Sequence, residues 1–342
     1  MVNKATPTLI GLIAAASAVT ALKLNPTKPI ESDTTSFFGG RDASILQHPA
    51  DWSRDIQPIG VHSHNDYWRD TPVLDALAHG VRSIESDVWL MNGELYVGHD
   101  PYSLSPERTF ESLTLAPLRK AIDQANDANA LLSSKSEAAF FKPLQDQLRT
   151  STTLPWNGFY TAGVGNAAPI QLLVDLKTEG RKTLEATIKA LHPLEQKGYL
   201  TTYKDGKITK GPIVVIGTGN TPTDALAALQ SRNIFVDCPL GKLSEDFQIE
   251  GQAYAYNSTL CGIASTSLGS LAPGYKGLMD PSADVVSNLT KAIDDAHLRG
   301  IATRVWDTPV WPSFVRDRVN GLLLSLGSDW INADDLDAIQ KW

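Results

Sequence analysis

Residues 82–90 read Arg-Ser-Ile-Glu-Ser-Asp-Val-Trp-Leu, a mostly apolar run typical of a buried strand. Side chains alternate along a strand, so Glu85 and Asp87 share one face, while Ile84, Ser86 and Val88 share the other. Two carboxylates on an interior face are unfavourable unless positive charge lies between them. A divalent cation with oxygen ligands, Mg²⁺ or Ca²⁺, meets that need. The alternative is a polar pair bonded to Arg or Lys.

Strand-like runs of this kind recur along the chain and alternate with amphipathic helical runs. Predicted strands cover residues 58–61, 82–90, 171–176, 212–216, 233–236, 253–256, 302–306 and 328–331, with an extra strand at 94–97. Predicted helices cover residues 72–79, 109–125, 180–191, 223–231, 283–298 and 312–325. Eight strand–helix repeats predict an α/β fold, a single (β/α)8 barrel. A doubly wound sheet is the alternative, but no Gly-x-Gly-x-x-Gly follows the first strand.

Length and composition agree with a globular protein. The chain has 342 residues, of which 42% are hydrophobic and 20% charged, and its net charge is −8. That acidic balance argues against nucleic acid as a partner, because sequence-independent binding needs a basic surface. Two cysteines exclude a disulfide-dense scaffold and a Cys-rich zinc site.

The N-terminal segment has the pattern of a secretory signal peptide. One Lys precedes a nearly uninterrupted apolar or small-residue stretch, which is short for a membrane span and is followed by small-residue cleavage patterns. We therefore expect a signal peptide at 1–21, an irregular lead-in at 22–55 and the barrel at 56–342. The predicted location is secreted or in the secretory lumen, with no stable membrane span after cleavage. An uncleaved anchor and an organelle-targeting sequence are the alternatives.

Two further features agree with a secretory route. Asn257 and Asn288 each begin an N-glycosylation sequon. In an oxidising compartment Cys238 and Cys261 could pair, and by loop entropy such a bridge would stabilise the fold by roughly 3 kcal/mol. Two buried free thiols are the alternative.

Other reactive side chains lie at predicted strand ends, which meet at the active-site mouth of a barrel. His62 ends the first strand and is well placed for proton transfer near neutral pH, although a single such histidine is more often a capping or core group. Asp175 and Lys177 share a face at the end of the 171–176 strand. Asp175 could then join a metal shell and Lys177 could hold an anionic oxygen. The alternative is a buried ion pair between them. His99 follows the short strand 94–97.

These motifs resemble the phosphatidylinositol-phospholipase-C-like phosphodiesterases. Val61-His62, Glu85-Ser86-Asp87 and His99-Asp100-Pro101 are similar to motifs of the glycerophosphodiester phosphodiesterase branch. That branch's Arg-Gly and Pro-Glu-Asn-Thr, which carries a metal-ligating Glu, are absent. The spacing His62-x-x-Asn65, the 174–178 strand, Trp306-Asp307 and the segment 327–332 resemble the sphingomyelinase D relatives. The motif His-Ser-His-Asn-Asp-Tyr at 62–67 resembles the fungal altered inheritance of mitochondria protein 6 family.

The resemblance implies a metal-dependent phosphodiesterase. In such an enzyme Glu85, Asp87 and Asp175 would hold Mg²⁺ or Ca²⁺, and His62 and His99 would form the acid–base or nucleophilic pair. The substrate side of the site would carry His64, Asn65, Lys177, Trp306 and Asn332. Because a phosphodiester needs its non-bridging oxygens neutralised and two protons moved, this residue set suits the reaction.

Two other functions fit parts of the sequence. A barrel that binds phosphate or lipid head groups without turnover would explain the missing glutamate motif. A metal-dependent amidohydrolase would use His62-Ser63-His64, but the later histidines, His192 and His297, do not complete its ligand set. A glycerophosphodiester, a lysophospholipid and a sphingolipid are all compatible with the sequence as substrates. Hydrolysis and cyclic-phosphate formation are both compatible as reactions.

Overall fold

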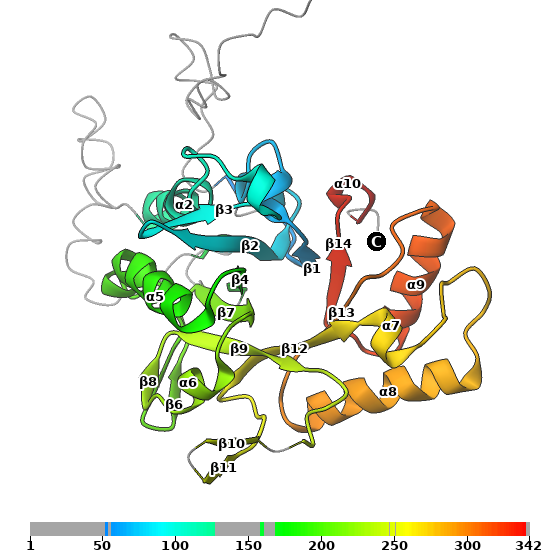
Figure 1. Cartoon of the computed structure of the whole chain (residues 1–342). Coiled ribbons are helices and arrows are strands. Elements are labelled where there is room, and N and C mark those ends of the chain that lie inside the picture. The colour runs from blue at the N-terminus through cyan, green and yellow to red at the C-terminus, as the bar shows by residue number, and fades with distance from the viewer. Residues whose placement is uncertain are drawn as a thin grey trace, which may run out of the picture. The chain divides into compact units, whose positions relative to one another are not determined.

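The computed structural model describes residues 52–53, 56–126, 158–160, 168–245, 247–249 and 251–339 (Figure 1). The chain separates into two units, Met1–His48 and Pro49–Trp342, and every described residue belongs to the second. The predicted signal peptide, and the lead-in apart from Trp52 and Ser53, lie outside the described residues. Within the described ranges, no helix combines the length and apolar character that crossing a membrane requires.

Eight parallel strands close into a barrel, which confirms the predicted fold class. The first strand pairs with both the second and the last, so the sheet has no free parallel edge. The short β3 (Glu94–Val97) adds an antiparallel partner to the outer half of the second strand. The barrel strands are β1 (Ile59–Ser63), β2 (Val81–Met91), β4 (Ile170–Leu176), β7 (Ile213–Gly219), β9 (Ile234–Pro239), β12 (Cys261–Ser267), β13 (Thr303–Trp306) and β14 (Trp330–Ala333).

Helices cover the outside of this barrel. In α8 the buried residues recur every three or four positions, so one face of the helix packs against the core. Ser282 begins α8 by accepting a hydrogen bond from the backbone N–H of Val285, at 3.3 Å. The helices are α1 (Leu74–Ala78), α2 (Ala116–Asn126), α5 (Gly180–Gln196), α6 (Thr223–Ala227), α7 (Leu268–Leu271), α8 (Ala283–Leu298), α9 (Ser313–Ser325) and α10 (Leu336–Ile339), with a π-helical turn at Glu111–Leu115 and 3₁₀ turns at Asp66–Trp68 and Pro101–Ser103.

One predicted barrel strand is wrong. Residues 253–256 were expected to form the sixth strand, but β11 (Gln252–Tyr254) pairs antiparallel with β10 (Phe247–Ile249) in a separate hairpin. The sixth barrel strand is β12, whose sequence Cys-Gly-Ile-Ala-Ser-Thr-Ser lacks a long apolar run. The hairpin attracted the prediction because its aromatic residues favour strands. Between β9 and β12 the described chain thus carries a hairpin. A second small sheet joins β5 (Thr202–Lys204), β6 (Lys207–Thr209) and β8 (Ser231–Arg232).

Two layers of side chains fill the barrel interior. The lower layer is apolar and forms its own buried cluster, separate from the core under the helices. Two positions further along each strand the inward residue becomes polar, because side chains of the same face recur at every second position. The lower layer comprises Leu173, Ile216, Phe235, Ile263 and Trp330. The upper layer on these strands comprises Asp175, Thr218, Asp237, Ser265 and Asn332.

A disulfide joins Cys238 in β9 to Cys261 in β12, two neighbouring strands of the barrel wall. Both residues are buried in the core between barrel and helices. The bridge spans a sequence separation of 23 residues. A loop of that size stabilises the folded state by about 3 kcal/mol, because the unfolded chain loses entropy.

Candidate active site

Three carboxylates converge at the carboxyl ends of two adjacent strands. Glu85 and Asp87 project from β2, and Asp175 projects from β4, where it lies in register with Asp87. One oxygen of each residue can be chosen so that all three lie within 4.8 Å of one another. Glu85 and Asp87 are buried, and Asp175 is partly buried. The expected ligand set is therefore brought together on the inner face of the barrel.

One lysine compensates part of this charge. Lys177 Nζ lies 2.7 Å from Asp175 Oδ2 and 3.0 Å from Asp87 Oδ2. Burial and the neighbouring carboxylates Glu85 and Asp175 nevertheless raise the pKa of Asp87 to about 7. Three carboxylates and one ammonium leave two negative charges at neutral pH when all are ionised. A divalent cation would balance them.

The cluster also has an unused ligand atom, and a glycine lies close against it. Asp87 Oδ1 is buried and has no hydrogen-bond partner. Gly219, at the end of β7, has φ +63°, and a Cβ there would lie 1.9 Å from Oδ1 of Asp175. Glycine at this position keeps a side chain away from the carboxylate. An orphaned oxygen among hard oxygen donors fits Mg²⁺ or Ca²⁺.

The turn after β1 supports Glu85. Asn65 adopts a left-handed conformation, φ 50°, and its backbone N–H donates to Glu85 Oε2 at 2.9 Å. Burial alone would raise the pKa of Glu85, but the imidazole of His62 and the cation Arg304 outweigh it and hold the pKa below its usual range. Glu85 is therefore held as a carboxylate.

His62 lies beneath the cluster on the Glu85 side. Its ring is fully buried, with Nδ1 2.8 Å from Ser83 Oγ and Nε2 3.5 Å from Glu85 Oε2. Nε2 has no hydrogen-bond partner. Burial and the positive charge of Arg304 lower the pKa of His62 to about 4, so the ring is neutral at pH 7. A neutral imidazole with a free nitrogen can take a proton.

His99 lies on the opposite, Asp87 side of the cluster. Its Nδ1 is 3.5 Å from Asp87 Oδ2, and half of the side chain is exposed. Tyr67 connects this side to the first turn: its hydroxyl lies 2.8 Å from Asp87 Oδ2, 2.5 Å from Asn65 Oδ1 and 3.4 Å from His99 Nδ1. Trp68 packs against His99 with ring centroids 5.3 Å apart. The two histidines thus flank the carboxylates.

His64 is turned toward the last strand of the barrel. Its Nδ1 lies 2.7 Å from Asp334 Oδ1, just after β14, and its Nε2 lies 3.9 Å from Glu85 Oε2. Burial lowers the pKa of His64, but the hydrogen bond to Asp334 and the charge of Glu85 outweigh this and raise it. His64 therefore links the cluster to β14.

The far wall of the mouth is also polar. Arg304 is buried, and its Nε donates to Asn332 Oδ1 at 3.1 Å, next to His62 in the β1–β14 register. Asp237 Oδ2 accepts hydrogen bonds from Ser265 at 2.6 Å and from Thr218 at 3.2 Å. Trp306 lies two positions beyond Arg304 on the same strand face and is partly exposed, so it sits at the rim.

Several contributors to this site were missed from the sequence. Tyr67 ends the 62–67 motif, and its place beside His62, His64 and Asn65 in that motif was the available signal. Arg304 and Asp237 stand at strand ends like the predicted residues, and the same alternation could have identified them. Ser83 and Asp334 contact histidines from distant parts of the chain, and no local pattern marks them.

The comparisons with known proteins identify the family. Residues 50–237 match the AIM6-like phosphodiesterase domain. The chain is also 32% identical to the altered inheritance of mitochondria protein 6 homolog of Arthroderma benhamiae, over 96% of this chain and 98% of that protein. The chain belongs to the AIM6-like phosphodiesterase family.

Further members of this family give similar values. Altered inheritance of mitochondria protein 6 from Eremothecium gossypii is 33% identical, over 85% of this chain and 71% of its own length. The Saccharomyces cerevisiae protein is 31% identical, over 83% and 70%. A solved phosphatidylinositol-specific phospholipase C from Listeria monocytogenes covers 85% of this chain and 97% of its own, with a TM-score of 0.34 and 10% identity.

The matched AIM6-like domain contains the whole carboxylate cluster and both flanking histidines, since all of them precede residue 237. Asn332 and Trp306 lie beyond it. The later histidines lie on helices: His192 of α5 contacts Glu195, and His297 of α8 lies 2.9 Å from Asp329. Neither contact adds a histidine ligand to His62 and His64, which disfavours the amidohydrolase alternative.

Proposed function

We propose that this family member is a metal-dependent phosphodiesterase that cleaves a glycerophosphodiester or a phospholipid head-group bond. His62 and His99 act as its proton-transfer pair, and Glu85, Asp87 and Asp175 hold Mg²⁺ or Ca²⁺. The observation that carries the proposal is the arrangement of the cluster. Three carboxylates, two of them in contact with the ammonium of Lys177, lie between two histidines, one beside Glu85 and one beside Asp87.

The cation, when bound, would supply positive charge to the non-bridging phosphate oxygens. Lys177 supports it, because its ammonium at the same cluster can bind a phosphate oxygen. In the reaction an O–P bond forms to the attacking oxygen, whose proton passes to one histidine. The bond to the leaving oxygen breaks as the other histidine protonates it.

The remaining residues position these groups. Ser83 holds His62 through Nδ1, which leaves Nε2 free toward the cluster. Tyr67 is held as a donor, because burial and the Asp87 carboxylate raise the pKa of its phenol. His64, Asn65, Asn332 and Trp306 form the substrate side, with His64 as a supporting group fixed by Asp334.

We also propose a secretory route, with removal of residues 1–21 and glycans on Asn257 and Asn288. Both asparagines are exposed, and a disulfide suits an oxidising compartment. Expression in a secreting fungal host should yield a protein whose electrophoretic mobility increases after endoglycosidase treatment. Unchanged mobility would contradict the glycan proposal, and a retained N-terminus would contradict cleavage.

The test of the enzyme is a phosphorus NMR assay of the purified full chain on a small phosphodiester panel. We expect turnover with Mg²⁺ or Ca²⁺, loss of turnover in EDTA, and loss of more than about 10³-fold in Asp87→Asn. Asp123→Asn is the matched control, because Asp123 pairs with Lys197 outside the site. Binding of phosphodiesters without turnover by wild type would favour the non-catalytic alternative.

A further inference from the structure

Exposed apolar side chains are concentrated on the connections that leave β12 and β13. Both connections start at the carboxyl ends of barrel strands, the end that carries the candidate site. Five side chains define what we call the mouth patch: Leu278, Met279, Val310, Trp311 and Phe314, with exposed fractions of 62, 78, 57, 80 and 58%. At the opposite end of the barrel, Leu229 follows α6, Leu298 ends α8 and Leu324 lies in the last turn of α9. Exposed apolar groups gathered in this way mark an interaction surface.

The two segments of the mouth patch are joined to each other. Arg318 in α9 donates to the carbonyl oxygens of Leu278, at 2.8 Å, and Gly277, at 3.2 Å. Phe314 lies one turn before Arg318 on the same face of α9. A Cβ at Gly277 would lie 2.5 Å from Val319 Cγ2, which shows how closely the loop packs on this helix. Contacts between its two segments therefore hold the mouth patch in place.

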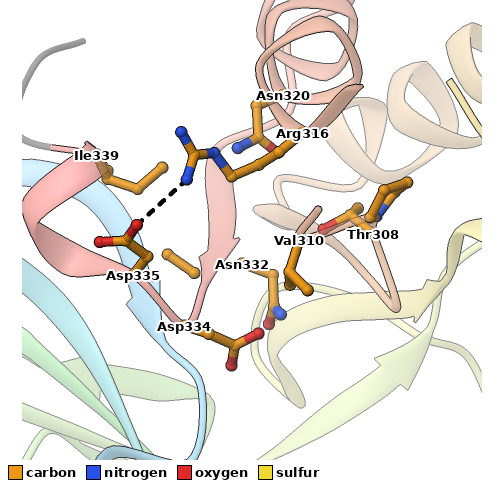
Figure 2. Close-up of a pocket in the computed structure, with 10 residues that line it drawn as sticks. Thr308, Val310, Arg316, Asn320, Asn332, Asp334, Asp335 and Ile339 are labelled. Atoms are coloured by element: carbon orange, nitrogen blue, oxygen red, sulfur yellow. Dashed lines mark hydrogen bonds and ion pairs between the residues drawn. The ribbon is translucent and has the colours of Figure 1, made fainter. Parts of the chain in front are cut away.

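A pocket connects the mouth patch to the candidate site. Thr308 and Val310 line it together with Asn332 and Asp334 (Figure 2). Asp334 is the partner of His64, and Asn332 lies beside His62 in the strand register. A surface that covered the patch would thus lie next to the catalytic groups.

The charges around the mouth patch indicate which kind of lipid surface it fits. Segments 275–282 and 306–318 together carry three cations, Lys276, Arg316 and Arg318, and three anions, Asp280, Asp307 and Asp317. The whole chain has a net charge of −8, which disfavours anionic membranes. Trp and Phe favour the water–lipid boundary, where an apolar ring meets polar head groups. A balanced, aromatic patch therefore fits a zwitterionic lipid surface.

We propose that the mouth patch docks this protein on a zwitterionic lipid surface and brings lipid head groups to the barrel mouth. Presentation of the head group as substrate rests on the proposed function, whereas the docking itself does not. A second copy of the chain bound to the same residues would cover the opening through which substrate enters, so the lipid surface is the better occupant.

The test measures cosedimentation of the full chain with phosphatidylcholine vesicles. The variant Trp311→Ser/Phe314→Ser removes two rings from the patch, and Leu298→Ser is the matched control, because Leu298 is 88% exposed at the other end of the barrel. We expect the double variant to bind at least about tenfold more weakly, since each ring loses apolar burial. Leu298→Ser should bind like wild type. Raising NaCl from about 0.1 to 0.5 M should change binding less than about twofold, because the attraction is not ionic.

Absence of vesicle binding by wild type, or equal binding by wild type and the double variant, would overturn the proposal. So would a dimer in solution that the double variant converts to monomer while vesicle binding is unchanged, since a second copy would then occupy the patch. Binding needs no turnover, so an inactive protein that binds through Trp311 and Phe314 supports docking and contradicts the enzyme. An active protein that does not bind the vesicles supports the enzyme and contradicts docking. Turnover of a soluble glycerophosphodiester should be equal in the double variant and wild type.

Discussion

The two side-chain layers inside the barrel differ in whether their burial stabilises the fold. In the lower layer Ile216 and Phe235 are buried in an apolar cluster, and their burial stabilises the fold. In the upper layer, Asp87 Oδ1, Asp237 Oδ1 and the nearby His62 Nε2 are buried without a partner. A separation of two residues along each strand divides the barrel into an apolar floor, where Trp330 Nε1 is also buried without a hydrogen-bond partner, and a mouth with unsatisfied ionisable groups. Unsatisfied groups are expected where a ligand binds.

Removing a proton-transfer group from the mouth should have the largest effect. We expect His62→Ala and His99→Ala each to lower kcat by about 10²–10⁴-fold, the usual contribution of acid–base catalysis. His64→Ala should lower it less, because His64 is fixed on Asp334. Steady-state kinetics and a bell-shaped pH profile would check this. An inactive His64→Ala with a nearly normal His62→Ala would mean that the proton-transfer assignment is two residues off.

Substitutions in the lower layer, the floor of the barrel, should lower stability without changing kcat. Ile216→Ala opens a cavity in a fully buried cluster and should lower the free energy of unfolding by about 2–5 kcal/mol. Denaturant unfolding measures the loss, and kcat at low temperature should match wild type. Leu324→Ala is the surface control, since that side chain is 44% exposed. A large loss of kcat in folded Ile216→Ala would break the division between the layers.

The disulfide lies outside both layers, so its removal should resemble a floor variant. Cys238→Ala/Cys261→Ala should lower the free energy of unfolding by about 3 kcal/mol, through the loop of the unfolded chain. Comparison of unfolding curves with and without reductant gives a second estimate. A stability independent of reductant would contradict the expectation, and unchanged kcat would agree with the placement of both cysteines behind the barrel wall.

Metal should stabilise the mouth. Like charges repel in the carboxylate cluster, so Mg²⁺ or Ca²⁺ at about 100 times its Kd should add about 2.7 kcal/mol to the free energy of unfolding. We expect Tm to rise with either ion in wild type and in Asp123→Asn, and not in Asp87→Asn. Differential scanning calorimetry checks this. An equal rise in Asp87→Asn would place the ion elsewhere.

The smallest effect should come from His79, which joins α1 to α10 outside both layers. Burial lowers its pKa, but contacts with Asp337 Oδ1, at 2.9 Å, and the carbonyl of Asp75, at 2.7 Å, outweigh this and raise it. The stabilisation is therefore complete below about pH 6.5, the ordinary pKa, and is lost as pH rises through the raised value. His79→Gln should lose a few tenths of a kcal/mol at pH 5.5 and nothing at pH 8.5, because Asp337 is largely exposed. If the free energy of unfolding of His79→Gln differed from that of wild type by the same amount at pH 5.5 and pH 8.5, the prediction would be wrong.

The sequence was most informative where a signal is local. Alternation placed Glu85 and Asp87 on one face, and the structure shows them together with Asp175. Apolar, strand-like runs located seven of the eight barrel strands. It failed at β12, where small residues suffice because the neighbours β9 and β13 provide the hydrogen bonds and helices provide the cover.

By itself the sequence determined the periodic features of this protein: the repeated strands, the carboxylates spaced by two, and the histidines at strand ends. Only the tertiary structure decided which distant groups meet. Ser83 turns His62 Nε2 toward Glu85, Asp334 holds His64, and Lys177 reaches two carboxylates on different strands. Period and burial follow from neighbours in the chain, whereas these contacts depend on barrel closure, which pairs β1 with β14 across some 270 residues. The charge imbalance of the mouth exists only after closure, because only then are the carboxylates removed from water together.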